Sequence, residues 1–466
     1  MDPAPAEEAP AGAYGGSRVS APDLLTPPPA AHDGRGVLAR PAVAEATAED
    51  LEISASVQAE AGAMEELLRR LIEQPSTLGN EQGGQAVMAE VFEELGLATA
   101  EVPMDADALR AHPGSSPFDW DVSGKTNLVA TWHPRGAAGG RSLIFNGHID
   151  VVSPEPVSQW RMPPFGAVRE GGWIYGRGAA DMKCGLAAIV GAVRGLKALG
   201  LSPKAPVHLE SVVEEECTGN GTLQTILAGH TADAAIVAEP FGAAITTSQV
   251  GVFWFHVLIR GVPVHAAEER RGLNAIERSL QVMQALRAFE AELNASPPAP
   301  FDRFPHPLNL NVGAIRGGDW TSTVPGECLT SYRIAMYPGM KVRDLQDRIE
   351  AVVAEAGVRA PAIFAPPEVR YGGFATEGYV IADDDPLVRT LAGAFARSVG
   401  TPPALVATTG TTDAGVLGIH GNTPAVCFGP YAEQSHGVDE RVWFPSVVQT
   451  AQVMALFVRD WCGLSG

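Results

Sequence analysis

The sequence is poor in several features that mark common classes of protein. Its 466 residues include only five cysteines and no Cys-x-x-Cys pair, so we expect neither a disulfide framework nor a cysteine-based zinc site. No run of about 18 apolar residues occurs, which leaves no candidate for a transmembrane helix. Basic residues are also scarce, since 33 Lys and Arg against 54 Asp and Glu give a net charge of −21. Nucleic acid and anionic membrane surfaces are therefore not expected as partners.

The beginning of the chain has a composition of its own. It lacks the basic and apolar regions of a secretory signal, so a reducing cytoplasm is the expected compartment. Of residues 1–50, 21 are Ala or Pro, and large apolar residues are scattered without a period. We expect this segment to remain a flexible tail, because it has little surface to bury. The whole chain is 45% apolar, which is enough for a substantial core.

Short apolar strands alternate with helical segments over most of the chain. Strand patterns occupy residues 127–132, 142–146, 207–213, 234–238, 404–407 and 424–428. Helical spacing marks residues 63–72, 85–95, 182–199 and 386–398, and a last helix that begins at Pro445. Strands that alternate with helices predict an α/β layered sheet.

The middle of the chain has a different order of elements. It reads strand, helix, strand, strand, helix, strand over residues 252–260, 274–293, 308–315, 328–336, 342–356 and 362–365. This order is the split βαβ pattern of a small α+β domain. We therefore predict one α/β domain formed by residues 51–250 and 366–466, interrupted by an inserted domain at residues 251–365.

Histidines and carboxylates recur where the predicted strands end, which is where open α/β sheets build their sites. His148 and Asp150 follow one strand, and they project together because residues i and i+2 of an extended chain face the same side. Another strand ends in three successive glutamates at residues 214–216. The mutual repulsion of these glutamates would be costly without a cation nearby.

Three more residues complete this pattern. Asp181 lies in a turn of small residues, Glu239 follows a strand, and His436 lies in a late loop. A single charged residue at a strand end is usually a solvated turn residue, so it is the joint pattern that supports a functional site. Two imidazoles and several carboxylates, without thiolate clusters, suit Zn²⁺, Mn²⁺ or Co²⁺. The sequence therefore predicts a divalent-metal site.

Five motifs occur in an order that identifies a family. They are Gly-His-Ile-Asp-Val-Val (147–152), Gly-Arg-Gly-Ala-Ala-Asp-Met-Lys (176–183), Glu-Glu-Glu-Cys-Thr-Gly-Asn-Gly (214–221), Ala-Glu-Pro (238–240) and Ser-His-Gly-Val-Asp-Glu (435–440). With them, residues 60–460 resemble the metallo-aminoacylase and peptidase family of acetylornithine deacetylase, succinyl-diaminopimelate desuccinylase, aminoacylase and glutamate carboxypeptidase. The resemblance implies a zinc-exopeptidase-like layered sheet, with an inserted ferredoxin-like α+β domain that serves as lid and dimerisation domain.

The resemblance also implies a centre of two divalent metal ions, with zinc as the first expectation and cobalt or manganese as alternatives. One metal would be held by His148 and Glu239, and the other by His436 and Glu216. Asp181 would bridge the two ions.

Two further acidic residues receive roles from the same motifs. Asp150 would orient His148, as residues behind a metal ligand commonly do. Glu215 would be the general base. The family motif usually reads Asp-Glu-Glu-x-Gly, and counting back from Gly221 assigns Glu216 to the metal and Glu215 to the proton. A shift by one residue among the three glutamates remains an alternative.

The inserted domain contributes its own candidates. His265 matches a histidine that would reach the partner subunit's site and stabilise the oxyanion, and a surface or helix-capping histidine is the alternative. Arg333 matches an arginine that often holds a substrate carboxylate, and a surface arginine on a strand is the alternative. Ser322 stands where many relatives have Asn, and its hydroxyl can still donate one hydrogen bond.

We interpret Cys184 and Cys217 as packing residues.

The function implied by the resemblance is metal-dependent hydrolysis of a non-peptide amide bond. The chain would remove an acyl or formyl group from a small N-acyl amine or amino acid. Two metals would activate a water, and Glu215 would take its proton and return it to the leaving amine. A dipeptidase or carboxypeptidase, a catabolic deaminase and a non-catalytic binding protein are the alternatives. We expect a small-molecule substrate and a homodimer formed through residues 251–365.

Overall fold

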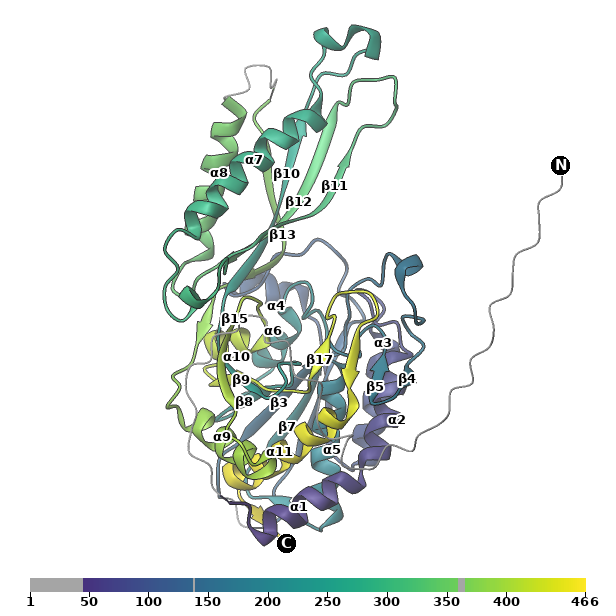
Figure 1. The fold of residues 1–466 in the computed structure, drawn as a ribbon, viewed down its shortest axis with the longest axis vertical. Coiled ribbons are helices and arrows are strands. Elements are labelled where there is room, and N and C mark those ends of the chain that lie inside the picture. Colours follow the sequence, from purple (N-terminus) through teal and green to yellow (C-terminus); the bar gives the residue numbers. More distant parts are fainter. Residues whose placement is uncertain (1–44, 137–138, 359–364) are drawn as a thin grey trace, which may run out of the picture. The chain divides into compact units, whose positions relative to one another are not determined.

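The computed structural model describes residues 45–136, 139–358 and 365–466 (Figure 1). Most of the tail expected over residues 1–50 lies outside these ranges, but its last part is helical. Helix α1 (Ala48–Ala59) begins there because Thr47 and Asp50 form a capping box, in which each side chain accepts a hydrogen bond from the other residue's backbone N–H. Helix α1 thus begins two residues ahead of the tail boundary expected at residue 50, and the Thr-x-x-Asp spacing is the sequence signal for the helix start.

The α/β part of the chain is built on one mixed sheet of nine strands. Eight of them follow one another in the order β1 (Ala98–Pro103), β2 (Thr126–Trp132), β7 (Val207–Val212), β3 (Leu143–His148), β8 (Ala235–Val237), β16 (Ala425–Cys427), β9 (Ala244–Gln249) and β14 (Tyr379–Val380). Strand β15 (Ala404–Thr408) pairs with β9. Strands β7, β3, β8 and β16 run parallel, so their carboxyl ends meet at one edge of the sheet. This sheet confirms the expected α/β class.

Helices cover both faces of the sheet. Gly147 of β3 faces α5 (Lys183–Ala198), since a Cβ at Gly147 would lie 2.9 Å from Leu186 Cδ2. The preceding Asn146 faces the other way and donates to Thr222 Oγ1 of α6 (Asn220–Leu227) at 2.9 Å. Strand β3 is buried at every position, as expected of a parallel strand with both faces covered.

The other helices complete these two layers. They are α2 (Ala61–Ile72), α3 (Gln82–Glu94), α4 (Ala106–Ala111), α9 (Pro386–Val399), α10 (Asp413–His420) and α11 (Phe444–Cys462). Helix α11 packs against α1, α5 and α9, whereas α10 packs against α6. Among the described residues, no helix is both long and apolar enough to cross a membrane.

A small second sheet joins two loops that are far apart in the sequence. It consists of β17 (Ala432–Glu433), β18 (Arg441–Trp443), β5 (Trp173–Tyr175) and β4 (Val168–Glu170). Arg441 lies opposite Tyr175 in the antiparallel pair of β18 and β5. The loop after β5 and the loop before β18 are therefore neighbours.

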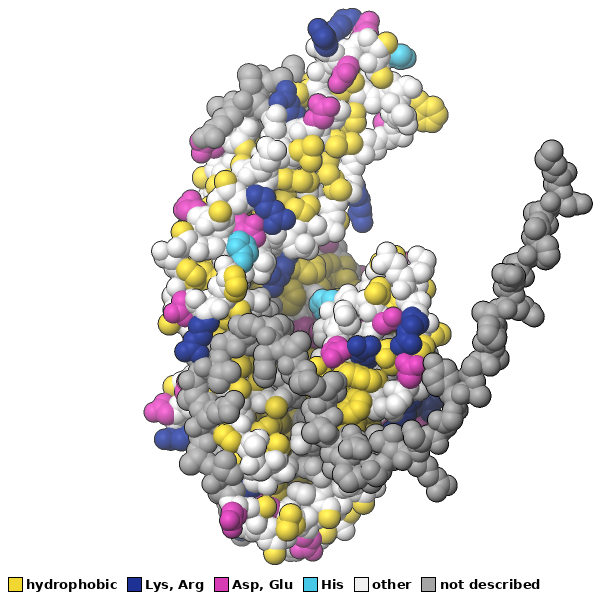
Figure 2. All heavy atoms as spheres, viewed as in Figure 1, with side chains coloured by type: hydrophobic (Ala, Val, Ile, Leu, Met, Phe, Trp, Pro, Cys, Tyr) yellow, Lys and Arg dark blue, Asp and Glu magenta, His cyan; other side chains and the backbone are white. Residues whose placement is uncertain are grey.

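The inserted domain has a four-stranded sheet in the order β11 (Leu310–Gly317), β12 (Glu327–Met336), β10 (Gly251–Arg260) and β13 (Glu368–Thr376). Helices α7 (Ala275–Leu293) and α8 (Val342–Val358) pack on one face, over the buried Phe253 and Phe255. The strand expected at residues 362–365 lies almost wholly outside the described residues. The last strand of this sheet is β13, which follows the boundary expected at residue 365. Figure 2 shows hydrophobic side chains gathered on the surface of this domain.

Asp50 of helix α1 forms buried ion pairs whose contribution to stability can be tested. Its buried carboxylate accepts hydrogen bonds from Arg459 of α11 at 2.6 Å and Arg397 of α9 at 3.3 Å. Burial raises the pKa of Asp50, but hydrogen bonds from Thr47 and Arg459 outweigh it and bring the pKa to about 2, below the ordinary 3.8. A folded-state pKa below the unfolded value means that this stabilisation is present above about pH 4 and is lost as the pH falls toward 2.

We therefore expect Asp50→Asn to lower the free energy of unfolding at pH 7 by about 1–2 kcal/mol, after allowance for solvent screening. Urea denaturation followed from pH 7 to pH 2 should show the difference from the parent shrinking below pH 4. Glu52→Gln, on an exposed position of the same helix, is the matched control and should match the parent throughout. A difference for Asp50→Asn that does not change with pH would contradict the ion-pair assignment.

Candidate metal centre

The predicted metal residues meet at the carboxyl edge of the central sheet. His148 ends β3, the glutamates at 214–216 follow β7, and Glu239 follows β8, so three parallel strands deliver them to one place. Asp181 lies two residues before the start of α5, and His436 lies in the loop between β17 and β18. The small second sheet brings these last two loops together.

One group of ligand atoms surrounds His148. Its Nε2 lies 3.1 Å from Asp181 Oδ1, 3.7 Å from Glu239 Oε1 and 3.7 Å from Glu215 Oε2. The imidazole is completely buried. Its Nδ1 donates to the backbone carbonyl of Asp150 at 2.8 Å, which leaves Nε2 directed at the carboxylates.

A second group surrounds His436. Its Nε2 lies 2.9 Å from Glu216 Oε2 and 3.4 Å from Asp181 Oδ2. The two oxygens of Asp181 therefore face different histidines, because Oδ1 lies toward His148 and Oδ2 toward His436. The geometry brings all five predicted metal residues together, with Asp181 in the middle.

The charges of these groups suit a cation. Burial raises the pKa of Glu215 and Glu239 well above the ordinary range, and neighbouring carboxylates add to the shift. The charge of Glu216 raises the pKa of His436 to about 11. Burial also raises the pKa of Asp181, but hydrogen bonds from both histidines bring it below its usual range. Carboxylate oxygens and imidazole nitrogens crowded this closely are a donor set that divalent zinc, manganese or cobalt fits.

The two ends of Asp150 contact different parts of the centre, and its carboxylate is not the group that meets His148. It lies 3.8 Å from His148 Nδ1, beyond hydrogen-bond distance, and the backbone carbonyl of Asp150 makes the contact to the ring. The carboxylate oxygens instead accept hydrogen bonds from the backbone N–H groups of Glu215 at 3.2 Å and Glu216 at 3.0 Å. Asp150 thus contacts both His148 and the glutamate loop, through different atoms.

Arg177 and Glu440 connect the loop that carries Asp181 with the loop that carries His436. Neither Arg177 nor Glu440 is among the predicted site residues. Both are buried and form an ion pair. Glu440 Oε1 also accepts from the backbone N–H of Ala180 at 2.8 Å and of Asp181 at 3.0 Å, while Arg177 donates to the carbonyl of Gly437 at 3.1 Å. Their signal in the sequence is their position inside the motifs at 176–183 and 435–440.

Glycines at two positions allow the close approach of these elements. Gly178 has φ of +84°, a conformation that favours glycine, and it turns the chain ahead of Asp181. Gly185 lies in the first turn of α5, where a Cβ would come within 2.1 Å of the Ala238 carbonyl oxygen. Because Ala238 precedes Glu239, this glycine lets α5 lie directly against the end of β8.

The candidates of the inserted domain lie apart from this cluster. His265 and Ser322 are exposed, and the backbone N–H of Ala266 donates to the Ser322 carbonyl at 2.9 Å. His265 Nδ1 accepts from the backbone N–H of Ala267 at 3.1 Å and caps the short helix Ala266–Arg271. Among the described residues, no hydrogen bond or ion pair joins His265 to the metal residues. His265 thus caps a helix in this chain, as the alternative interpretation expected. A role of His265 toward a partner subunit stays a prediction.

Arg333 is half-buried on β12, and burial lowers the pKa of its guanidinium. Within the described ranges, no carboxylate forms an ion pair with it. All five cysteines are free and buried, and among the described residues none belongs to the groups of side chains that could hold a metal ion. The expectations of no disulfide and of packing roles for Cys184 and Cys217 agree with this.

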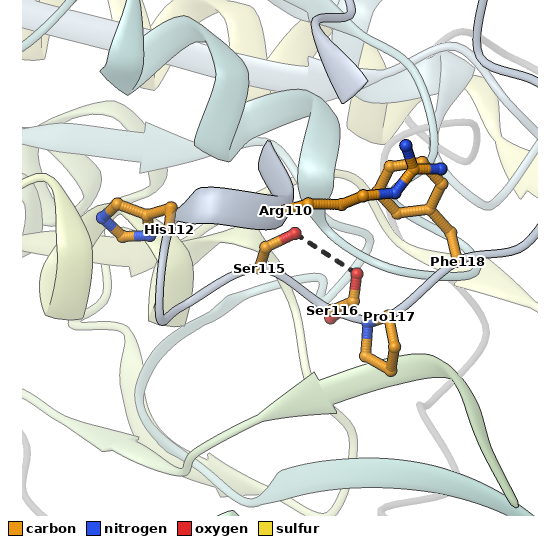
Figure 3. Close-up of a pocket in the computed structure, with 6 residues that line it drawn as sticks. All are labelled: Arg110, His112, Ser115, Ser116, Pro117 and Phe118. Carbon is orange, nitrogen blue, oxygen red and sulfur yellow. Dashed lines mark hydrogen bonds between the residues drawn. The ribbon is translucent and has the colours of Figure 1, made fainter. Parts of the chain in front are cut away.

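A cavity of about 240 Å³ lies along the segment that follows α4. Figure 3 shows its lining residues, Arg110, His112, Ser115, Ser116, Pro117 and Phe118. None of the predicted site residues lines it. Ser116 is buried, and its hydroxyl donates to the carbonyl of Thr218 at 2.6 Å, so this segment supports the loop that carries the glutamates.

Comparison with known proteins identifies sequence relatives of this chain. N-formyl-4-amino-5-aminomethyl-2-methylpyrimidine deformylase from Halalkalibacterium halodurans is 30% identical over 367 residues, which cover 74% of this chain and 85% of the relative. Succinyl-diaminopimelate desuccinylase from Methylocella silvestris is 29% identical over 411 residues, which cover 85% of this chain and 97% of the relative.

Solved structures give the same fold. The di-peptidase Dug1p from Saccharomyces cerevisiae superposes with a TM-score of 0.73 at 14% identity, covering 89% of this chain and 98% of that one. YXEP from Bacillus subtilis, described as a dinuclear metal-binding peptidase of the M20 family, superposes with a TM-score of 0.56 at 15% identity, covering 86% and 98%.

The expected fold, a layered sheet interrupted by an α+β domain, is confirmed. The resemblance drawn from the five motifs is confirmed as well. The sequence pattern of peptidase family M20/M25/M40 matches residues 144–460, which contain every predicted site residue. The chain belongs to peptidase family M20/M25/M40.

Proposed function

We propose that this chain is a two-metal amidohydrolase that removes an acyl or formyl group from a small N-acyl amine or amino acid. The observation that carries the proposal is the position of Asp181, whose two carboxylate oxygens lie toward His148 and His436. A carboxylate that directs one oxygen toward each of two histidines is suited to bridge two cations.

The ligand sets follow from the distances. His148, Asp181 and Glu239 would hold one ion, and His436, Asp181 and Glu216 the other. We propose zinc, with cobalt or manganese as alternatives, because all three accept mixed nitrogen and oxygen ligands. When bound, the ions supply an activated water and polarise the substrate carbonyl.

Glu215 is proposed as the general base. Its carboxylate is buried, lies beside the His148 group and faces no basic side chain at hydrogen-bond distance among the described residues. It would accept a proton from the attacking water at a carboxylate oxygen and donate that proton to the amine nitrogen as the C–N bond breaks. An amide needs both transfers, because an unprotonated amine is a poor leaving group.

The substrate class is proposed from the relatives and from Arg333. The two relatives described above carry the names of a deformylase and a desuccinylase, which favours a non-peptide amide. Arg333 would bind a substrate carboxylate, and its guanidinium has no carboxylate partner within the described residues. Ser322 would donate one hydrogen bond to the substrate from the lid. A dipeptidase or carboxypeptidase fits the same fold but is favoured by no further observation, and nothing favours a catabolic deaminase or a non-catalytic protein.

We further propose that the enzyme works as a homodimer. Residues 51–250 and 366–466 would form the catalytic domain and residues 251–365 the lid and dimerisation domain, although the position of β13 favours a later return to the catalytic domain, after Thr376. Strand β11 is an edge strand, and Leu280, Ile315 and Trp320 of the inserted domain are exposed. An open edge with exposed apolar side chains is suited to two-fold pairing.

The remaining proposals concern compartment and partners. Five free cysteines suit a reducing cytoplasm. The excess of acidic residues favours a small-molecule substrate over nucleic acid or an anionic membrane surface.

The central test combines metal analysis with a substrate panel. Purified protein loaded with Zn²⁺, Mn²⁺ or Co²⁺ is expected to contain two ions per chain and to hydrolyse N-formyl, N-acetyl or N-succinyl amines faster than dipeptides. The metal-free protein should be inactive and regain activity on reloading. No activity on any N-acyl amine, together with rapid dipeptide hydrolysis, would transfer the assignment to the peptidase alternative.

Variants of neighbouring glutamates test the order of roles. Glu215→Gln is expected to keep both metals and to lower kcat by about 10²–10⁴-fold, the usual contribution of general acid–base catalysis. Glu216→Gln should instead lose affinity for one ion, since its carboxylate lies 2.9 Å from His436 Nε2. Elemental analysis and kcat measured side by side separate the two, and exchanged phenotypes would mean that the roles are shifted by one residue.

The role of His265 is tested by complementation between subunits. An oxyanion donor contributes about 10²–10³-fold in rate, so His265→Ala should keep its metals and turn over slowly. Mixed with Glu215→Gln under conditions that exchange subunits, it should regain activity, because one site of the heterodimer is then intact. Failure to regain activity despite demonstrated exchange would rule out action in trans, and a monomer in solution would rule out the dimer.

A further inference from the structure

We propose that Lys125 is a positioning residue for the general base, because its ammonium group holds Glu214 and thereby the loop that presents Glu215 and Glu216. This inference rests on the proposed function for the role of Glu215. The contacts that carry it come from the segment between α4 and β2, which contains Lys125 and none of the predicted site residues.

Lys125 joins two carboxylates in the interior. Its Nζ lies 2.7 Å from Glu214 Oε1 and 3.0 Å from Glu81 Oε1. All three side chains are buried, with 7% of Lys125, 0% of Glu214 and 4% of Glu81 exposed. Burying three charged groups is expensive, and well-packed apolar side chains usually give a fold of equal or greater stability. The triad therefore calls for an explanation other than stability, and defining the position of Glu214 is one.

Glu214 occupies a strained backbone position directly ahead of the base. Its φ is +62°, in the left-handed region that non-glycine residues rarely adopt. Its Oε1 also accepts from Trp120 Nε1 at 2.8 Å. Its carbonyl oxygen accepts from the backbone N–H groups of Thr218 at 3.1 Å and Gly219 at 2.9 Å. The side-chain contacts hold the residue in this conformation, and the backbone contacts close the loop.

The next two residues are held by a different side chain. The backbone N–H groups of Glu215 and Glu216 donate to the two carboxylate oxygens of Asp150. The loop is thus bound by Lys125 at its first glutamate and by Asp150 at the two glutamates that face the metal site. Releasing Glu214 would let the loop relax and would move the Glu215 carboxylate, and a displacement of about 1 Å can cost about 10²-fold in rate.

The same segment contacts the loop at its far end. Ser116 donates through its backbone N–H to Asn220 Oδ1 at 3.0 Å, and Asn220 Nδ2 donates back to the Ser116 carbonyl at 3.0 Å. Residues 116–125 therefore bind the glutamate loop at both ends, and Lys125 makes the charged contact.

The experiment compares Lys125→Met with the parent and with the control variant Lys341→Met. The control removes an exposed lysine of the inserted domain that pairs with Glu377. Hydrogen exchange of the metal-free proteins is measured by mass spectrometry on peptides covering residues 213–221. We expect Lys125→Met to speed exchange at Glu215, Glu216, Thr218 and Gly219, while strand β9 and the Lys341→Met control match the parent.

Kinetics of the zinc-loaded proteins supply the second measurement. Lys125→Met should lower kcat by about 10–100-fold while KM and zinc content stay within about twofold of the parent, and Lys125→Arg should restore much of kcat. A merely structural lysine would change the amount of folded protein without this split between kcat and KM. Should Lys125→Met not fold, Glu214→Gln replaces it, since the amide keeps an acceptor for Trp120 but loses the charge that Lys125 binds.

Two results would overturn the proposal. One is parent-like exchange and kcat in the folded variant, and the other is a loss of zinc in proportion to activity, which would make the triad a support of the metal instead of the base. The exchange measurement uses neither metal nor substrate. If the parent hydrolyses no N-acyl amine, the proposed function fails, while the exchange data still decide whether Lys125 holds the loop.

Discussion

Negative charge is concentrated at one edge of the central sheet, and much of the structure around that edge serves to hold it there. Asp181, Glu215, Glu216 and Glu239 lie within a few ångströms of two histidines, and burial raises the pKa of Glu215 and Glu239 well above the ordinary range. Carboxylates brought together in this way repel one another unless cations lie between them. The donor set and its charge therefore both suit divalent cations.

Two features of the fold make this concentration possible. Parallel pairing of β7, β3 and β8 delivers residues from three strands to one edge, which is the general position of sites in open α/β sheets. The small second sheet then adds the Asp181 loop and the His436 loop, which the buried pair of Arg177 and Glu440 ties together. Hydrogen bonds to the backbone or ring support His148, Asp181 and Glu216, and metal residues supported in this way keep their orientation.

The inserted domain contributes in a different manner. Its sheet has an open edge at β11, and its candidate residues His265 and Ser322 are exposed and distant in the chain from the metal ligands. If the inserted domain is the proposed lid, the predicted metal residues and the candidate substrate-binding residues lie in separate domains. Such a division suits a family whose relatives include both a deformylase and a desuccinylase.

The sequence by itself determined the class of fold and the ligand types, because both depend on local patterns. Alternating strands and helices predicted the layered sheet, and five motifs in order predicted which histidines and carboxylates would meet. The pattern did not locate the fourth strand of the inserted sheet, β13, whose small residues Gly372 and Gly373 weaken its apolar alternation. It also overlooked the start of α1, where a capping box in an Ala-rich segment is easily mistaken for a tail.

Only the tertiary structure decided how the ligands are held. Asp150 was expected to orient His148, and in the structure its backbone carbonyl contacts the ring while its carboxylate binds two amides of the glutamate loop. The motifs contain Arg177, Glu440 and Glu214, but only the tertiary structure shows that Arg177 pairs with Glu440 and that Lys125 pairs with Glu81 and Glu214. These pairs join residues up to 263 positions apart, as in Arg177 and Glu440, and no local pattern records which distant carboxylate a buried cation will meet. Hydrophobic periodicity and motif spacing act along the chain, whereas the pairing of buried charges depends on which segments the completed fold brings into contact.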